Sequence, residues 1–336
     1  MANSPNELLT DLLKDVSRSF YLTLRVLPKK IRPQIGVAYL LARTSDTIAD
    51  TEILPLNERL AVLQNFRQRL LGEKIPLGLS QLAEKQSSPA ERTLLERYKE
   101  SLSIFFDLHP FDRKLALEVL QTIISGQELD LQRFASASQQ KIVALQTDAE
   151  LDDYTYRVAG CVGEFWTKMC RAHLFPEGKF DDVFLLTNGV RFGKGLQLVN
   201  ILRDLPADLR KGRCYLPIEK LSAAGLSPAD LLSPSNEKRF RPLYDHYLDV
   251  AQKHLEAGWD YTNALPRRCV RVRLACAWPI LIGVKTLAKL RTANVLDAER
   301  RIKVSRGEVK QIIWRTVFCY PFPGAWRKLF LRARCE

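Results

Sequence analysis

Apolar residues recur at spacings of three and four along almost the whole chain, and this periodicity most limits the folds open to it. The segments "NERLAVLQNFRQRLL" (57–71) and "RKLALEVLQTIISGQELDLQRF" (113–134) are typical. Such spacing places apolar side chains on one face of an α-helix. Alternating β-branched runs, which would predict a sheet, are absent, and clusters of Pro and Gly separate the helical segments. The sequence therefore predicts an all-α fold of roughly ten or more helices.

A chain of 336 residues is long enough to bury a large core. We expect one helical domain over residues 1–310, followed by a basic, aromatic tail over residues 311–336 that packs loosely. The seven cysteines are scattered without CxxC spacing, which fits reduced thiols better than a disulfide framework or a zinc site. No signal peptide and no apolar run of bilayer length is visible. These features predict a cytoplasmic protein, with the inner membrane face as a possible peripheral location.

Positive charge is concentrated at the C-terminal end. Residues 267–336 hold 17 Lys and Arg against 4 Asp and Glu, so this segment accounts for the whole net charge of +13. Its basic residues alternate with bulky apolar ones, and no DNA or RNA module is recognisable. Nucleic acid is therefore not an expected partner. The pattern favours peripheral contact with an anionic membrane, and the alternative is an ordinary solvated helix surface.

The segment "RTSDTIAD" (43–50) contains two aspartates, Asp46 and Asp50, four residues apart. Arg43 precedes Asp46 by three residues and Tyr39 precedes Arg43 by four, so all four share one helix face. A single acidic pair of this kind occurs on many exposed helices and is weak evidence for a metal. The pair becomes informative because the chain contains a second one.

The second acidic pair, Asp204 and Asp208, continues a stripe that begins with Gln197 and Asn200. Apolar neighbours flank the stripe, which predicts that it lines the interior of a bundle. Unpaired carboxylates are costly to bury, and Mg²⁺ resolves this cost by taking oxygen ligands that it shares with substrate phosphates. Pro206 lies between the two aspartates, so we expect the helix to end near it and to leave Asp208 on an irregular turn.

Four segments, in this order, resemble the squalene and phytoene synthases, which join two prenyl diphosphates head to head. The resemblance covers roughly residues 8 to 310. The matching segments are "SRSFYLTLRVLP" (17–28), "YLLARTSDTIAD" (39–50), "YTYRVAGCVGEFW" (154–166) and "GLQLVNILRDLPADLRKGRCYLP" (195–217). The resemblance implies a single-domain isoprenoid-synthase helical bundle with a central cavity, Mg²⁺ held by both aspartate motifs, and farnesyl or geranylgeranyl diphosphate as substrate.

The resemblance also implies roles for individual residues. Asp46, Asp50, Asp204 and Asp208, together with Asn200, look like metal ligands, and the four aspartates and Tyr154 look like the catalytic set. The tyrosine would lie near the ionising carbon. The implied substrate contacts are Arg18, Phe20, Tyr39, Arg43, Val158, Gln197, Asn200, Arg203 and Arg213. For each arginine the alternative is a structural ion pair, and for Tyr154 it is ordinary packing.

The small residues of "VAGCVG" have two interpretations. Ala159, Gly160 and Gly163 would let a polyprenyl chain approach the backbone, or would let two helices pack closely. The second interpretation needs compensation, because each glycine costs roughly 1 kcal/mol of helix propensity.

The reduced or non-reduced nature of the product is the main open choice. The segments "RVRLACAWPILIGVKTLAKL" (271–290) and "RIKVSRGEV" (301–309) look more like the squalene synthase branch, which implies NADPH held by Lys303 and Arg306. Ser305 stands where that branch usually has another basic residue. The expected reaction is condensation of two farnesyl diphosphates through presqualene diphosphate to squalene. The alternatives are phytoene, dehydrosqualene or presqualene diphosphate synthesis without reduction.

Two function classes outside this family activity are alternatives. A catalytically silent membrane-surface protein of the same fold would be favoured by loss of an aspartate, yet all four are present. A terpene cyclase would carry a clustered DDxxD and an NSE-type motif, and neither occurs. The sequence does not predict an oligomeric state.

Overall fold

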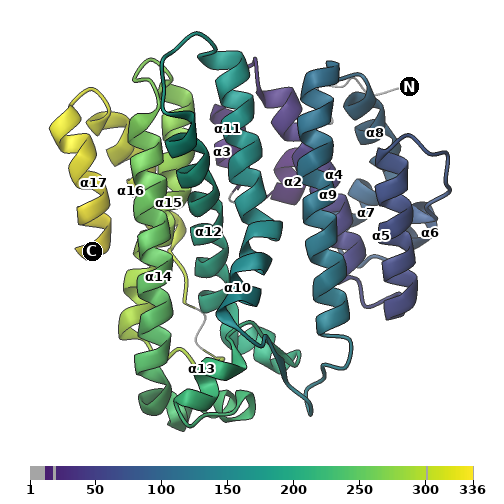
Figure 1. Ribbon diagram of the computed structural model, residues 1–336, viewed down its shortest axis with the longest axis vertical. Helices are drawn as coiled ribbons and strands as arrows, with labels where there is room; N and C mark the ends of the chain where they lie inside the picture. The colour runs from purple at the N-terminus through teal and green to yellow at the C-terminus, as the bar shows by residue number, and fades with distance from the viewer. Residues whose placement is uncertain (1–11, 18–19, 300–301, 336) are drawn as a thin grey trace. The chain divides into compact units, whose positions relative to one another are not determined.

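The computed structural model of the protein describes residues 12–17, 20–299 and 302–335, and it is almost entirely helical (Figure 1). Within the described residues the only sheet pairs two short parallel strands, β1 (Val143–Ala144) and β2 (Arg213–Cys214), with Val143 opposite Arg213. The all-α prediction is confirmed. The helices expected over 57–71 and 113–134 appear as α5 (Leu56–Leu70) and α9 (Pro110–Arg133).

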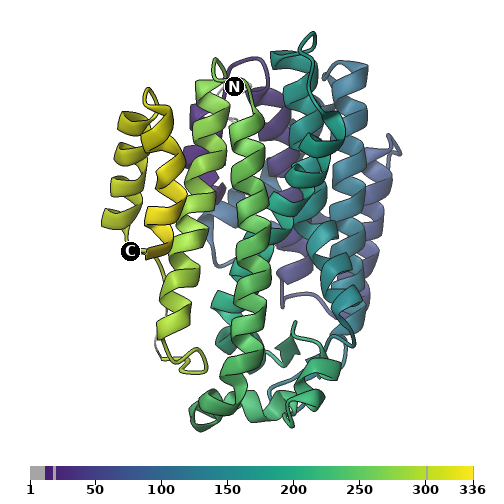
Figure 2. The ribbon, with the colours of Figure 1, turned by 60° about the vertical axis from the view of Figure 1, so that its left-hand side comes forward.

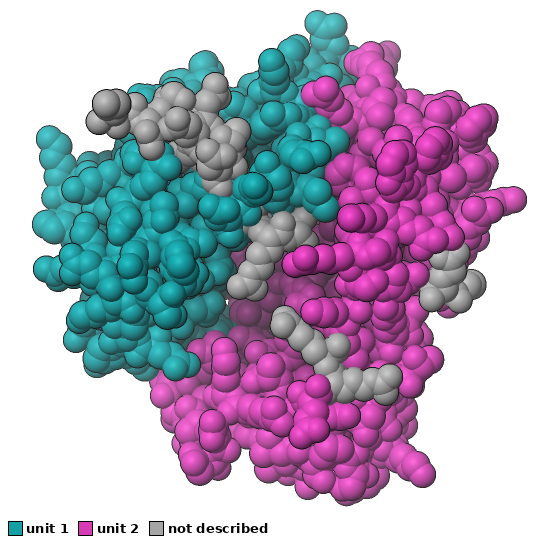
Figure 3. Space-filling model, turned by 180° about the vertical axis from the view of Figure 1, so that it is seen from behind, with its two compact units in different colours: residues 1–132, 165–178 teal, residues 133–164, 179–336 magenta. Residues whose placement is uncertain are grey.

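Contacts within the chain divide it into two compact units, coloured separately in Figure 3. Unit 1 comprises residues 1–132 and 165–178, and unit 2 comprises residues 133–164 and 179–336. By residue number, helix α11 (Cys161–Leu174) is divided between the units, with residues 161–164 in unit 2 and 165–174 in unit 1. The remaining helices of unit 1, besides α5 and α9, are α2 (Leu13–Ser17), α3 (Phe20–Val26), α4 (Arg32–Asp50), α6 (Leu79–Glu84), α7 (Pro89–Glu96) and α8 (Tyr98–Phe106).

Unit 2 contains the longest helices of the described chain. The 29-residue helix α12 and the 28-residue helix α14 lie side by side in Figures 1 and 2. The helices of unit 2 are α10 (Asp148–Thr155), the π-helix η2 (Tyr156–Gly160), α12 (Asp182–Arg210), α13 (Ile218–Ala223), the 3₁₀ turns η3 (Pro228–Leu232) and η4 (Pro234–Asn236), α14 (Glu237–Ala264), α15 (Val270–Thr292), α16 (Arg306–Cys319) and α17 (Pro323–Cys335).

Local sequence signals explain where the site-bearing helices begin. Helix α4 has a proline in its first turn, where a missing N–H costs nothing. Helix α12 begins after Asp181, whose carboxylate accepts a hydrogen bond of 2.9 Å from the Phe184 amide. Both helices bury one face: Leu40, Leu41 and Ile48 of α4 are fully buried, and Leu198, Ile201 and Leu202 beside the α12 polar stripe are buried.

The C-terminal helices are packed within unit 2. The indole of Trp326 in α17 is 2% exposed, stacks on Trp259 of α14, and donates a hydrogen bond of 2.9 Å to Asn263. The expectation of a loosely packed tail is therefore wrong, because α17 buries an apolar face that the basic composition concealed. Helix α16 runs across residue 310, and a domain boundary there stays a prediction. No helix in the described part of the chain has the length and apolar character to cross a membrane.

Candidate active site

The first acidic pair lies on α4 in unit 1. The guanidinium of Arg43 forms an ion pair with Asp46 and donates a second hydrogen bond, of 2.9 Å, to Glu91 of α7. Asp50 is the last residue of α4 and is exposed. Tyr39, one turn before Arg43, is half-buried. The helical spacing thus brings Arg43 and Asp46 together as expected, and Glu91 joins them from a segment to which the sequence assigned no role.

The surroundings of Asp46 disfavour its ionised form. Burial and the neighbouring charge of Asp50 raise the pKa of Asp46 to about 6, while the adjacent Arg43 acts to lower it. A divalent cation would offset the charge of Asp50 that acts on the Asp46 carboxylate.

The second acidic pair lies on α12 in unit 2. Arg203 donates a hydrogen bond of 2.9 Å from its Nε to Asp204, and this contact raises the pKa of the guanidinium. Asn200 is exposed, and Gln197, Asp204 and Asp208 are half-buried, whereas Ile201, Leu202 and Leu205 on the adjoining face are buried. Each acidic motif therefore consists of carboxylates on a partly open helix face, with an arginine beside it.

Helix α12 continues through Pro206 to Arg210, so the expected helix end near that proline is wrong. Proline at this position cannot donate to the carbonyl of Leu202, four residues earlier. The hydroxyl of Tyr244 in α14 donates a hydrogen bond of 2.9 Å to that carbonyl instead. Asp208 consequently stays on the helix, one turn beyond Asp204.

The donor set fits magnesium better than a metal held by protein alone. Among the described residues no group of three or more His, Cys, Asp or Glu side chains could hold a metal ion. Mg²⁺ commonly takes one or two carboxylates, keeps several waters and uses substrate phosphates for the rest. Two carboxylates on each motif match that requirement.

Tyr154 lies in an aromatic stack within unit 2. Its ring is buried and stacks on Tyr215, with centroids 4.7 Å apart, and Tyr215 meets Phe134 edge to face at 5.2 Å. The guanidinium of Arg213 lies 5.9 Å from the centroid of Phe134. Strand β2 holds Arg213 and places Tyr215 immediately after the β1–β2 pairing.

Sequence reasoning missed Tyr215 and Phe134 as neighbours of Tyr154. Tyr215 belongs to the family-like segment that ends in "GRCYLP". The segment therefore pointed to position 215 but did not indicate that its ring contacts Tyr154. Phe134 is the residue that follows α9, and no local pattern connects it to position 154. Both form the surroundings of the candidate catalytic ring.

The small residues around 160 serve close helix packing. A Cβ atom built on Gly163 would lie 1.8 Å from the backbone oxygen of Gly189, and one on Gly193 would lie 2.1 Å from that of Ala159. Val158 and Gly160 belong to η2, a π-helical turn of a kind that often occurs at functional sites. Of the two interpretations of these glycines, the structure supports helix packing at Gly163.

Lys303 and Arg306 are exposed at the start of α16. Lys289 of α15 donates to the backbone oxygen of Lys303 at 3.3 Å and to Glu308 at 2.7 Å, which ties this segment to α15. Arg18 and the side chain of Phe20 lie outside the described part of the structure. The central cavity implied by the family resemblance stays a prediction.

The sequence profile described as "Squalene/phytoene synthase" matches residues 13–308 of this chain. The chain belongs to the squalene/phytoene synthase family. It is therefore related to enzymes that condense prenyl diphosphates, and the motif resemblance is confirmed at the level of the family.

Individual relatives divide among products. A presqualene diphosphate synthase of Rhodopseudomonas palustris is 30% identical over 253 residues, covering 75% of this chain and 77% of that protein. A squalene synthase of Schizosaccharomyces pombe is 26% identical over 313 residues, covering 91% of this chain and 64% of that protein. The chain spans about half to two thirds of the length of the first curated relatives, from 49% to 64%.

The fold is shared with a solved structure of TcSQS in complex with a ligand. The TM-score is 0.78 at 21% sequence identity, with 98% of this chain and 90% of that chain covered. The prediction of an all-α isoprenoid-synthase fold is thereby confirmed.

Proposed function

We propose that this chain condenses two farnesyl diphosphates through presqualene diphosphate and reduces the intermediate to squalene with NADPH. The observation that supports this most directly is that both acidic pairs occur on helices, each with an arginine bound to its first aspartate. A catalytically silent relative would have no reason to keep this paired arrangement.

The acidic motifs would bind and orient the diphosphates. Asp46 and Asp50 would hold one set of magnesium ions, and Asp204 and Asp208, with Asn200 beside them, another. Magnesium supplies charge neutralisation for the diphosphate leaving group. Arg43 and Arg203 keep the first carboxylate of each motif in place, and their remaining N–H groups suit phosphate oxygens.

The aromatic stack would protect the allyl cation that forms when the diphosphate leaves. The faces of Tyr154, Tyr215 and Phe134 are electron-rich and apolar, so they attract a cation while excluding water. Burial leaves little solvent at Tyr154. In this proposal the tyrosine lies near the ionising carbon, and Tyr215 fixes the orientation of its ring.

One observation favours the runner-up function, presqualene diphosphate synthesis without reduction. The relative of that name is 30% identical to this chain, above the 26% of the squalene synthase quoted with it. Labelled farnesyl diphosphate incubated with Mg²⁺, with and without NADPH, separates the two functions. We expect squalene only with NADPH. Accumulation of the cyclopropyl diphosphate under both conditions would establish the runner-up.

Neutralising Lys303 and Arg306 should slow the reduction to squalene without slowing the condensation to presqualene diphosphate. Both side chains are exposed, and loss of two cation–phosphate contacts could cost a few kcal/mol of NADPH affinity. The variant Lys303→Ala with Arg306→Ala should therefore form the cyclopropyl diphosphate at the normal rate while squalene falls about tenfold or more at limiting NADPH. Product analysis by chromatography measures the ratio, and raising NADPH should partly restore it.

The matched control neutralises Lys29 and Lys30, two exposed lysines of unit 1, and should leave the product ratio unchanged. Unchanged squalene yield and unchanged NADPH dependence in the Lys303/Arg306 variant would show that these residues are ordinary surface charges.

A further inference from the structure

Helix α16 and the turn that follows it expose large apolar side chains, and both α16 and α17 carry exposed cations. On α16 and the turn that follows it, Trp314, Phe318 and Phe322 are 63%, 65% and 64% exposed. Trp314 and Phe318 stack on one another with centroids 5.5 Å apart. We call these three residues, with Val317 at 45% exposure, the aromatic strip.

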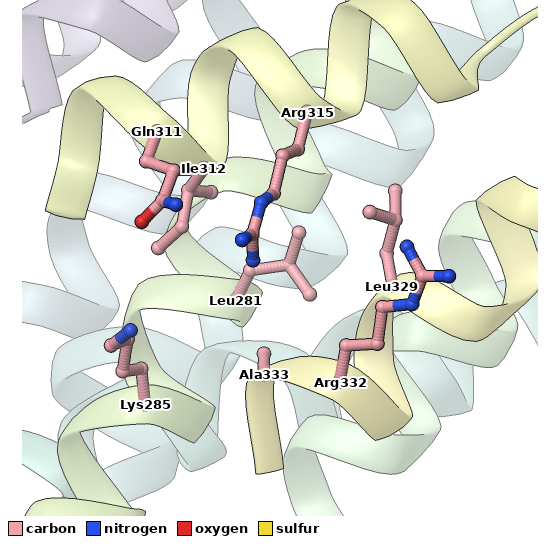
Figure 4. Close-up of a pocket in the computed structure, with 8 residues that line it drawn as sticks. All are labelled: Leu281, Lys285, Gln311, Ile312, Arg315, Leu329, Arg332 and Ala333. Atoms are coloured by element: carbon pink, nitrogen blue, oxygen red, sulfur yellow. The ribbon is translucent and has the colours of Figure 1, made fainter. Parts of the chain in front are cut away.

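The two helices also carry exposed cations. They comprise Lys310, Arg327, Lys328, Arg332 and Arg334. Figure 4 shows a pocket between α15, α16 and α17 that adds Lys285 and Arg315 to the positive lining, beside Leu281 and Ile312. The acidic residue described on these two helices, Glu308, is bound to Lys289 and Lys285.

The opposite faces of α16 and α17 are buried against the rest of unit 2. Ile312 and Thr316 of α16 are buried, as are Trp326, Leu329 and Phe330 of α17, and the Trp278 indole donates to Thr316 at 2.8 Å. The packing of unit 2 therefore does not require the aromatic strip. An exposed apolar patch rimmed by polar residues marks an interaction site.

We infer that the aromatic strip and its cations are a contact surface for an anionic lipid leaflet. Aromatic rings partition to the headgroup level, and lysine and arginine are attracted to anionic headgroups. A second copy of the chain is a poorer occupant, because two such surfaces would bring like charges together. The contact is peripheral, since no described helix could cross the bilayer.

Co-sedimentation with vesicles tests this surface. The probes are phosphatidylcholine vesicles with and without one third phosphatidylserine, at low and high salt. The wild type should bind the anionic vesicles and release them at high salt. Replacing Arg327 and Lys328 by Gln should weaken the partition coefficient about fivefold per charge. The variant Trp314→Ala with Phe318→Ala should weaken it on the order of tenfold.

The controls are Phe111→Ala, which removes an exposed aromatic ring of α9, and Lys29→Gln with Lys30→Gln, which removes exposed charges of unit 1. Both should bind as the wild type does. Equal binding by the Trp314/Phe318 variant and the wild type would overturn the inference. So would a wild-type dimer, seen by analytical ultracentrifugation, that the same variant converts to a monomer.

An independent observation concerns the helix segment that carries the second acidic pair. Pro206 leaves the Leu202 carbonyl without its helical donor, and the buried hydroxyl of Tyr244 fills that role at 2.9 Å. The aromatic ring is held in turn by Arg241, whose guanidinium lies 5.5 Å from its centroid and donates to the Leu290 carbonyl at 3.1 Å. Burial raises the pKa of Tyr244, so its hydroxyl remains a donor.

The geometry points to Tyr244 as a positioning residue for Asp208. A buried carbonyl without a donor is costly, and a helix that bends at Pro206 to reach water would turn Asp208 away from Asp204. The hydrogen bond from α14 removes that reason to bend. This assignment rests on the proposed function only for its effect on metal binding, because the link between residues 206 and 244 is testable without turnover.

A double-mutant cycle between Tyr244→Phe and Pro206→Ala tests the link. Alanine at 206 restores an N–H that donates to the Leu202 carbonyl, so the tyrosine hydroxyl becomes dispensable. Binding of Mg²⁺ with inorganic pyrophosphate is measured by calorimetry. In the natural background, Tyr244→Phe should weaken pyrophosphate binding on the order of tenfold. In the Pro206→Ala background, the same substitution should change the affinity by no more than about twofold.

The control is Tyr247→Phe, whose hydroxyl donates to Asp148 of α10 at 2.7 Å and whose effect should not depend on residue 206. Equal effects of Tyr244→Phe in both backgrounds, on pyrophosphate binding and on melting temperature, would overturn the assignment. The same double-mutant cycle, measured by melting temperature, reports the coupling between residues 206 and 244 even if the chain makes no prenyl product. Failure of the proposed function is therefore distinguishable from failure of this inference.

Discussion

Replacing Asp204 by Asn should remove nearly all turnover and leave the protein folded. Asp204 lies on the partly open face of α12 and contacts Arg203, so the substitution changes charge at the proposed metal site without opening a cavity. We expect a loss of about 100-fold or more in kcat, together with a requirement for higher Mg²⁺. Steady-state assays over a Mg²⁺ series measure both quantities.

Asp46→Asn should give the same loss of turnover and a distinctive stability effect. Because the pKa of Asp46 is raised to about 6, its ionised form is disfavoured in the folded protein. Stability is therefore lost as pH rises from the ordinary carboxyl pKa of 3.8 through about 6, and the penalty is absent only below 3.8. The side chain is 41% exposed, so solvent screening limits the effect to about 1 kcal/mol or less.

The metal-free Asp46→Asn protein should consequently melt at the same temperature as the wild type, or slightly above it, at pH 8. At pH 5 the two should differ less. Full activity of either aspartate variant at low Mg²⁺ would remove that motif from the site, and a large fall in melting temperature would mean that the loss of turnover reflects misfolding.

The sequence was sufficient for the helices and the acidic stripes because both depend on local spacing. A separation of three or four residues places Arg43 beside Asp46 whatever the rest of the chain does. Partners from distant segments were not predictable in this way. Glu91 reaches Arg43 across 48 residues, and Tyr215 reaches Tyr154 through the pairing of β1 with β2.

The error at Pro206 has the same origin. Local rules correctly say that proline removes a helical hydrogen bond, and they predict a break when nothing replaces it. The replacement comes from Tyr244, 42 residues away from the carbonyl that it satisfies. A tertiary contact thus reverses a local preference at the motif where the position of a carboxylate matters most.

The loose packing expected for the tail is wrong because composition averages over the two faces of a helix. The segment after 310 is basic overall, yet α17 buries Trp326, Leu329 and Phe330 while its cations remain exposed. The charge excess and the packing are both present, on opposite faces. The membrane contact inferred for the outer face therefore does not require a mobile segment.

Gly163→Ala should strongly destabilise unit 2, because the added methyl group would collide with backbone atoms. The new Cβ atom would lie 1.8 Å from the Gly189 oxygen and 2.5 Å from its carbonyl carbon, and both are backbone atoms that no rotamer change can move. Overpacking of this kind costs about 3 kcal/mol or more when the helices must separate. That cost corresponds to a fall in melting temperature on the order of 10 °C, measured by circular dichroism.

The matched control is Gly324→Ala in α17, where an added Cβ atom meets nothing within 4 Å. Alanine is the better helix former, so this variant should melt at or slightly above the wild-type temperature. Since residues 154–160 lie against α12 beside Gly163, the Gly163 variant should also lose turnover in proportion to the unfolded fraction. A Gly163→Ala protein that melts as the wild type does would refute close backbone packing as the reason for glycine here. It would reopen the alternative in which this glycine makes room for a prenyl chain.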